Sequence, residues 1–146
     1  MRSRAELVSL RVEDLEMGSQ GRCSILLRKS KTDQVGTRQW IHLTLETTEA
    51  ITIWLQAAEI KEGYLLRGIH LGDKICPELG ANQVSRIFKA LAKKAKLDPM
   101  IVEGISGHSM RVGAAQDLLM QGASLPQIMV KGGWVKTDTV MRYIDK

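Results

Sequence analysis

The most informative part of the chain is the segment Ser-Gly-His-Ser-Met-Arg-Val-Gly-Ala-Ala, residues 106–115. It places His108 and Arg111 three residues apart, so a helix that starts nearby presents both side chains on one face. Both can donate hydrogen bonds to an anion, and the backbone amides and dipole at a helix start also favour negative charge. The segment predicts a helix from about Ser109 to Gln121 with an anion site at its beginning. The same pair of residues also arises by chance in helices that bind nothing.

Two shorter motifs lie downstream, Gly-Gly-Trp at residues 132–134 and Val-Met-Arg-Tyr at residues 140–143. Ser124 and Gln127 have the spacing of a capping box, which predicts a short helix that the glycine pair ends. A last helix, capped by Thr137 or Asp138, carries the tyrosine. Taken alone, this pattern is typical of a tyrosine that packs in a core or an interface.

A strongly periodic segment lies upstream and predicts a helix that begins at Asn82, a good N-cap residue. Opposite its apolar positions lies a basic stripe formed by Arg86, Lys89, Lys93 and Lys96. Basic side chains at this spacing suit contacts with DNA phosphates, which hold a protein on DNA without reading its sequence. A solvated helix face explains the same pattern equally well.

The first half of the chain carries the strand-like segments. Residues 4–10 look like the end of a helix, and three extended segments follow at residues 11–17, 22–29 and 38–45. The last two flank a polar, turn-rich stretch at residues 30–37, which predicts a β-hairpin. A helix is then expected from Thr47 to Gly63, followed by a connection without clear periodicity. The sequence therefore predicts a mainly α fold with a small antiparallel β-sheet near the N-terminus.

The composition is that of a globular protein rather than a disordered one. Hydrophobic residues make up 44% and charged residues 25% of the 146 positions, and the net charge is +5. The apolar runs are shorter than the roughly 18 residues that cross a bilayer, so we expect neither a transmembrane segment nor a signal peptide. The positive charge is compatible with a nucleic acid partner and equally with ordinary solvation.

Metal-binding patterns are missing from the sequence. Cys23 and Cys76 are the only cysteines, and they lie far apart without a nearby histidine that would complete a tetrahedral site. The carboxylates do not cluster in a way that suits a pair of magnesium ions. We therefore expect a reducing compartment and no metal ion or other cofactor.

The motifs His-x-x-Arg, Gly-Gly-Trp and Arg-Tyr, in this order, resemble the catalytic domain of the tyrosine site-specific recombinases, the phage integrase family. The surrounding sequence is most similar to the Cre-like members. Two further segments agree, Arg-Ala-Glu-Leu-Val-Ser-Leu-Arg-Val-Glu-Asp-Leu at residues 4–15 and Ser-Lys-Thr-Asp at residues 30–33. The resemblance spans essentially the whole chain and implies the recombinase catalytic-domain fold.

The resemblance also implies a role for each matching residue. Tyr143 would be the nucleophile that attacks a DNA phosphodiester, forms a 3′-phosphotyrosine bond and releases a 5′-hydroxyl. Arg111 would bind the non-bridging phosphate oxygens, and His108 would donate to the same phosphate or assist proton transfer. Trp134 would add an indole N–H and apolar packing, and Lys31 would protonate the leaving oxygen, although a lone lysine in a turn is more often simply solvated. The bond energy is stored in the phosphotyrosine, so no ATP is needed.

One functional position departs from the family pattern. The family places an arginine three residues before the glutamate of its first motif, which is Glu6 here, and that position is Ser3. Arg2 and Arg4 flank it, yet a shift of one residue on a helix turns a side chain by about 100°. An arginine that neutralises charge in phosphoryl transfer is worth about three to five orders of magnitude in rate, so we expect strongly impaired cleavage.

The resemblance further implies an organisation and partners. We expect residues 1–146 to form a single catalytic domain that lacks both the N-terminal core-binding domain of related proteins and the segment that follows their tyrosine. The expected partner is double-stranded DNA in the cytoplasm of a prokaryote or phage host, without a membrane. Self-association on DNA, tetrameric in related proteins, is doubtful without these parts.

Three functions remain open on the sequence. The first is a recombinase catalytic domain that breaks and rejoins DNA. The second is a DNA-binding remnant that keeps the fold but has lost the chemistry, which Ser3 favours. The third is a DNA relaxer similar to type IB topoisomerases, which share the nucleophile and the fold.

Overall fold

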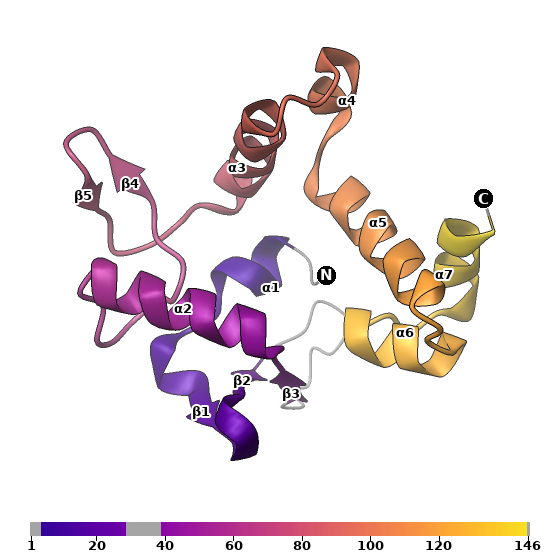
Figure 1. Cartoon of the computed structure of the whole chain (residues 1–146), viewed down its shortest axis with the longest axis horizontal. Coiled ribbons are helices and arrows are strands. Elements are labelled where there is room, and N and C mark those ends of the chain that lie inside the picture. Colours follow the sequence, from indigo (N-terminus) through magenta and orange to yellow (C-terminus); the bar gives the residue numbers. More distant parts are fainter. Residues whose placement is uncertain (1–3, 29–38, 146) are drawn as a thin grey trace. The chain divides into compact units, whose positions relative to one another are not determined.

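A computed structural model describes residues 4–28 and 39–145 of the chain (Figure 1). The predicted functional positions Ser3 and Lys31, and the turn-rich stretch at residues 30–37, lie outside these ranges. The chain divides into two compact units. One unit is residues 5–80, and the other is residues 81–146 together with the N-terminal residues up to Arg4. Helix α1, Arg4–Val8, begins at this division, and its place agrees with the helix end expected there.

The unit of residues 5–80 is built on a three-stranded antiparallel sheet. Its strands are β1 (Leu15–Met17), β2 (Cys23–Leu27) and β3 (Gln39–His42), in the order β1-β2-β3. The alternating residues Cys23, Ile25 and Leu27 of the central strand are buried, so one face of the sheet forms the core. The antiparallel pairing of β2 with β3 confirms the predicted hairpin. Short 3₁₀ turns, Val12–Asp14 and Ser19–Gly21, flank β1 and shorten the first extended segment to three residues.

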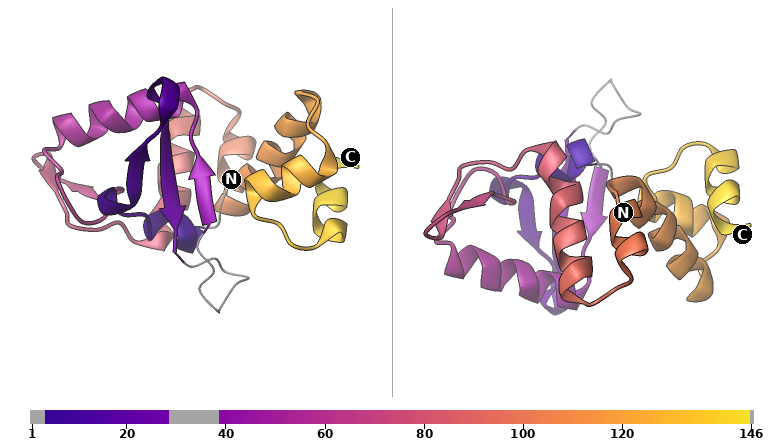
Figure 2. Two further views of the ribbon diagram at one scale, coloured as in Figure 1. Left: turned by 90° about the horizontal axis from the view of Figure 1, so that it is seen from below. Right: turned by 90° about the horizontal axis from the view of Figure 1, so that it is seen from above.

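Helix α2, Leu45–Ala57, lies alongside this sheet (Figure 2). It begins two residues earlier than expected because the Thr44 hydroxyl caps it by accepting the Thr47 amide. Thr48 faces the sheet, and its hydroxyl accepts the amide of Cys23 at 3.0 Å. One side-chain hydrogen bond thus joins the helix to the central strand.

The end of α2 and the connection after it differ from the sequence-based expectation. The helix ends at Ala57 rather than Gly63, because Glu59 takes a left-handed conformation (φ 55°) and the Ile60 amide donates back to the Leu55 carbonyl. The following segment contains a small antiparallel hairpin, β4 (Ile69–His70) and β5 (Lys74–Ile75). Strands of two residues are too short to show a periodic pattern.

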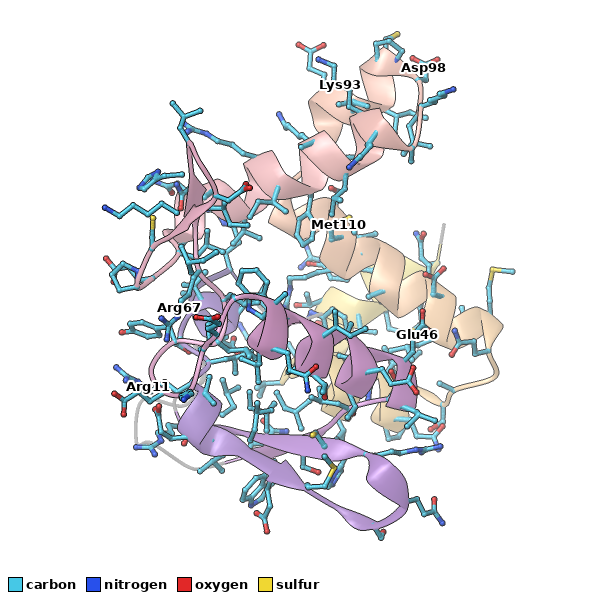
Figure 3. All side chains as sticks on the ribbon, turned by 60° about the vertical axis from the view of Figure 1, so that its left-hand side comes forward. Arg11, Glu46, Arg67, Lys93, Asp98 and Met110 are labelled. Atoms are coloured by element: carbon cyan, nitrogen blue, oxygen red, sulfur yellow. The ribbon has the colours of Figure 1, made fainter. Side chains whose placement is uncertain are left out.

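Three arginines order the loops of this unit. The Arg11 guanidinium lies 4.4 Å from the centre of the Tyr64 ring, and Arg67 Nε donates to the Tyr64 carbonyl at 2.8 Å (Figure 3). At the end of β2, Arg28 donates two hydrogen bonds, of 2.7 and 3.0 Å, to the buried Asp14 carboxylate. The hydrogen bonds and charge of Asp14 raise the pKa of Arg28. The contacts with Arg11 and Arg67 hold Tyr64 in the loops of this unit.

The unit that contains residues 81–146 is helical. Its helices are α3 (Ala81–Lys94), α4 (Pro99–Gly104), α5 (Gly107–Met120), α6 (Leu125–Gly132) and α7 (Thr137–Ile144). The last three pack together around a core of Ala115, Ile128, Trp134 and Val140 (Figure 2). The mainly helical fold with a small antiparallel sheet near the N-terminus is confirmed.

Several helix boundaries in this unit correct the expectations. Helix α3 begins at Ala81, so Asn82 lies inside it and is not its cap. Helix α4 was not expected, although Asp98 caps it by accepting the Met100 amide. Helix α7 has Lys136 at its N-cap position, without a side-chain cap from Thr137 or Asp138. In the described part of the chain, none of the helices has the length and apolarity that a membrane span requires.

Candidate functional site

The start of α5 is set by a reciprocal pair of serines. Ser106 Oγ accepts the Ser109 amide at 3.2 Å, and Ser109 Oγ accepts the Ser106 amide at 2.8 Å. This capping box starts the helix at Gly107, two residues earlier than expected. His108 is therefore the second residue of the helix and Arg111 lies one turn beyond its start. The first turn carries no acidic residue.

Gly132 and Gly133, at the end of α6, are each required for a different physical reason. Gly133 takes the left-handed conformation (φ 74°) that closes the helix, and the Trp134 amide donates to the Met129 carbonyl at 2.9 Å. Gly132 is buried, and a Cβ atom there would overlap the six-membered part of the Trp134 ring. The first glycine makes room for the indole, and the second turns the chain so that the indole packs back on the helix.

Tyr143 lies between two of the predicted site residues. Its ring meets the His108 ring edge-on with 5.5 Å between centroids, and the Trp134 ring in the same manner at 6.0 Å. The Tyr143 side chain is half-buried, whereas His108 is exposed. Gln116 Nε2, on α5, donates to the Tyr143 backbone carbonyl at 3.0 Å and so holds α7 against α5.

Trp134 joins the arginine to this group. The Arg111 guanidinium lies 5.0 Å from the centre of the Trp134 ring, a cation–π arrangement. The indole itself is only 8% exposed. Its Nε1–H is buried and has no hydrogen-bond partner in the described part of the chain. The arrangement gives Trp134 a packing role under both Arg111 and Tyr143 and leaves its N–H donor unused.

An open hollow of about 460 Å³ lies beside the tyrosine. It is lined by His108, Val112, Arg142 and Tyr143. Arg142 belongs to the Arg-Tyr motif, which predicts no role for it. The hollow is therefore bordered by a phenol, an imidazole and a guanidinium, which can bind and attack an anionic ester.

Besides Arg142, two residues that support this site had no role predicted from the sequence. Gln116 donates a hydrogen bond to the backbone of Tyr143, and Gly132 acts by having no side chain. The glycine pair was visible as a motif, but its packing role was not. The sequence offered no signal for Gln116, because its partner is 27 residues away.

The predicted basic stripe lies on α3, and the structure does not bring it to the hollow. Arg86 and Lys93 are exposed on the side opposite the buried Val84, and Lys89 is half-buried. Lys96 lies beyond the end of the helix, with a positive φ of 60°. The stripe is thus shorter than the sequence suggested. Within residues 4–28 and 39–145, His, Cys, Asp and Glu side chains form no group of three that could hold a metal ion.

Comparison with known proteins finds one family and two recombinases to which the chain is similar. The model of the family described as "Phage integrase family" matches residues 1–146. Recombinase Cre of Escherichia phage P1 is 31% identical over 153 residues, which cover 96% of this chain and 44% of that protein. The crystal structure of XerA recombinase shares the fold, with a TM-score of 0.74 at 18% identity over 99% of this chain and 48% of that one. The chain spans less than half the length of both relatives.

Proposed function

Because the chain belongs to the phage integrase family, we propose that it is the catalytic part of a site-specific recombinase that cleaves and rejoins double-stranded DNA through Tyr143. The observation that carries the proposal is the grouping of Tyr143, His108, Trp134 and Arg111 on the packed helices α5 to α7. These residues come from three separate motifs.

The proposed reaction is a transesterification. The Tyr143 phenol oxygen forms a bond to the phosphorus while the bond from phosphorus to the 5′ oxygen breaks. The phenol proton passes to His108 or to water as attack proceeds, and the departing 5′ oxygen takes a proton, for which Lys31 is the proposed donor. Rejoining reverses these steps with the 5′-hydroxyl of another strand, so neither a metal ion nor ATP enters the balance.

The charged and polar residues would lower the barrier by stabilising the phosphate in the transition state. Arg111 offers a planar fork to two non-bridging oxygens, a geometry that a lysine does not provide. His108 is exposed and borders the hollow, so it is available to donate to the same phosphate. Trp134 supports the Arg111 guanidinium and the Tyr143 ring. Arg111 and Tyr143 thus share one rigid support, which favours a fixed distance between nucleophile and phosphate.

Covalent capture tests this proposal. A pool of nicked duplexes with randomised sequence around one phosphate releases a short strand on cleavage, which traps the attached protein. We expect the chain to become covalently linked to a subset of duplexes, which sequencing then identifies. Peptide mapping should place the DNA on Tyr143, and Tyr143→Phe should abolish the adduct.

The matched control is Tyr64→Phe, which changes the other tyrosine, held in the unit of residues 5–80. It should leave adduct formation within about twofold, because phenylalanine keeps the ring that packs against Arg11 and removes only the hydroxyl. Capture at Tyr64 or no capture at any duplex would contradict the proposal. Retention of DNA without covalent attachment would support the second candidate, a DNA-binding remnant, which Ser3 favours.

A further inference from the structure

Arg142 borders the hollow beside Tyr143 but has no part in the proposed reaction. It lies in the last turn of α7, is exposed, and lines the hollow together with His108, Val112 and Tyr143. Asp138 lies one turn earlier on the same helix, yet Arg142 forms no ion pair with it or with another residue that the structure describes. Its guanidinium is therefore available to an anion that enters the hollow.

The hollow is longer than a single phosphate requires. His108 and Val112 are four residues apart on one face of α5, so the hollow runs about 6 Å along that helix. Its volume of about 460 Å³ is roughly fifteen times the share of one water molecule in the liquid, whereas a phosphate group has only five heavy atoms. A stretch of DNA backbone with more than one phosphate fits this space.

The guanidinium of Arg142 and that of Arg111 reach Tyr143 by different routes. Arg111 lies over the Trp134 ring, which meets the Tyr143 ring edge-on, and it is not among the described residues that line the hollow. Arg142 lies on the hollow side, where His108 meets the same tyrosine ring. Successive phosphates of a DNA strand each carry one negative charge. Two guanidiniums at separate places beside one nucleophile suit two successive phosphates.

We propose that Arg142 binds the phosphate next to the scissile one on the cleaved strand. The inference rests on the proposed function for its substrate, double-stranded DNA. Arg142 directly precedes Tyr143 in the chain, and Gln116 holds the Tyr143 carbonyl at 3.0 Å, so a grip on the neighbouring phosphate fixes the strand relative to the nucleophile. The contact is the same before and during attack, so it strengthens DNA binding and leaves the rate of the bound complex unchanged.

The first experiment measures DNA binding without cleavage. A duplex that the whole chain retains from the randomised pool is titrated at several salt concentrations and followed by fluorescence anisotropy. Arg142→Ala should weaken binding about tenfold, the size of one charge-assisted hydrogen bond, and lower the salt slope by about 0.9. Lys136→Ala removes a cation from the exposed N-cap position of the same helix, outside the hollow, and should change neither value. Equal effects of the two variants, or none from either, would overturn the proposal.

The second experiment locates the phosphate. Single methylphosphonates, which lack one negative charge, replace in turn the scissile phosphate, each of its two neighbours and a distant phosphate. At one of the two neighbours, Arg142→Ala and the unmodified chain should bind equally, and the tenfold difference should persist at the other positions. Loss of the difference at the scissile phosphate would overturn the proposal.

The same scan tests a structural role for Arg142. A cation in the last turn of a helix also interacts favourably with the helix dipole, and Arg142→Ala removes this interaction from α7. A purely structural role predicts the same weakening on every duplex, whichever phosphate is neutral. A difference in affinity that persists at all substituted positions would therefore overturn the proposal.

The third experiment separates binding from chemistry on a captured duplex. For Arg142→Ala, the DNA concentration that gives half the maximal adduct rate should rise about tenfold, while the maximal single-turnover rate stays within about twofold. A lower maximal rate at unchanged half-saturation would place Arg142 on the reacting phosphate and contradict the proposal. If no chain forms an adduct but one neutral phosphate cancels the effect of Arg142→Ala, the proposed function fails and the phosphate contact stands. If adducts form and Arg142→Ala changes neither affinity nor rate, the function stands and this inference fails.

Discussion

Gly132 and Gly133 show that the same residue type serves two different physical purposes at neighbouring positions. Gly133 supplies a left-handed backbone conformation, which side chains disfavour. Gly132 has ordinary helical geometry and is needed because the Trp134 ring occupies the space of a side chain. The position of Trp134, and with it the support beneath Arg111 and Tyr143, therefore depends on a missing methyl group.

Replacing Gly132 by alanine should displace the Trp134 ring. We expect a loss of about 1–3 kcal/mol in the free energy of unfolding, the usual cost of overpacking a core. Adduct formation should fall as well. Urea unfolding and tryptophan fluorescence measure the first effect, and the capture assay measures the second.

Gly113→Ala is the matched control, since nothing lies within 4 Å of a Cβ at this position of α5. Alanine is the better helix former, so Gly113→Ala should stabilise the chain by about 0.5–1 kcal/mol. Equal effects of the two changes would show that the indole does not pack on Gly132.

Within each unit, a side-chain hydrogen bond joins two secondary-structure elements. Thr48 joins α2 to β2 through the Cys23 amide, and Gln116 joins α5 to α7 through the Tyr143 carbonyl. Both bonds satisfy backbone groups that regular secondary structure leaves unpaired at these places. They connect elements that are far apart in the sequence, so their loss should loosen packing more than local helix content.

Thr48→Val tests the link between helix and sheet. The shape of the side chain is kept, but the buried Cys23 amide loses its acceptor, which should cost about 1–3 kcal/mol of unfolding free energy. Thr52→Val is the control, because Thr52 is exposed and its hydroxyl bonds only within α2. We expect a change below about 0.5 kcal/mol there. Urea unfolding of both variants measures the two changes in unfolding free energy, provided that the dependence of the free energy on urea concentration is the same.

Gln116→Ala tests the link between α5 and α7. Without the amide, the last turn of α7 should move more freely, and the adduct should form at least tenfold more slowly with little change in DNA binding, because the distance between nucleophile and phosphate is less fixed. Asp117→Ala, at the exposed neighbouring position, is the control. A parallel loss of binding and rate would indicate general unfolding instead.

At the scale of the whole molecule, charge governs the encounter with DNA. The net charge of +5 is modest, so the placement of basic residues matters more than their number. Arg86 and Lys93 are exposed on one face of α3, opposite the buried Val84, while Lys94 lies about 100° around the helix from Lys93. A DNA-binding face on this side of α3 would include Arg86 and Lys93 but not Lys94.

Lys93→Ala should reduce the steepness of the salt dependence of DNA binding. Each released counterion contributes about −0.9 to the slope of log K against log salt, so one lost contact should lower it by about that amount. Lys94→Ala should have a smaller effect. Fluorescence anisotropy at several salt concentrations measures both slopes, and equal slopes would favour a merely solvated helix face.

Local signals in the sequence were sufficient for much of this protein. The capping box of Ser124 and Gln127 correctly predicted the start of α6, and the turn-rich stretch between two extended segments predicted the pairing of β2 with β3. The ordered motifs were sufficient for the family, which the match over residues 1–146 confirms. These features depend on neighbours within a few residues, where hydrogen bonding and periodicity act directly on the chain. The roles of Tyr143, Arg111 and the other site residues stay predictions.

Features that depend on distant partners came only from the folded chain. Helix α2 ends at the left-handed residue Glu59, where no glycine in the sequence indicates a helix end. The strands of the β4–β5 hairpin have two residues each, too few for a sequence pattern. The Gln116 bond to Tyr143 and the Arg4 contact with Gly107 join residues that are 27 and more than 100 positions apart. Packing selects such contacts by shape and space in three dimensions, and a sequence pattern records neither.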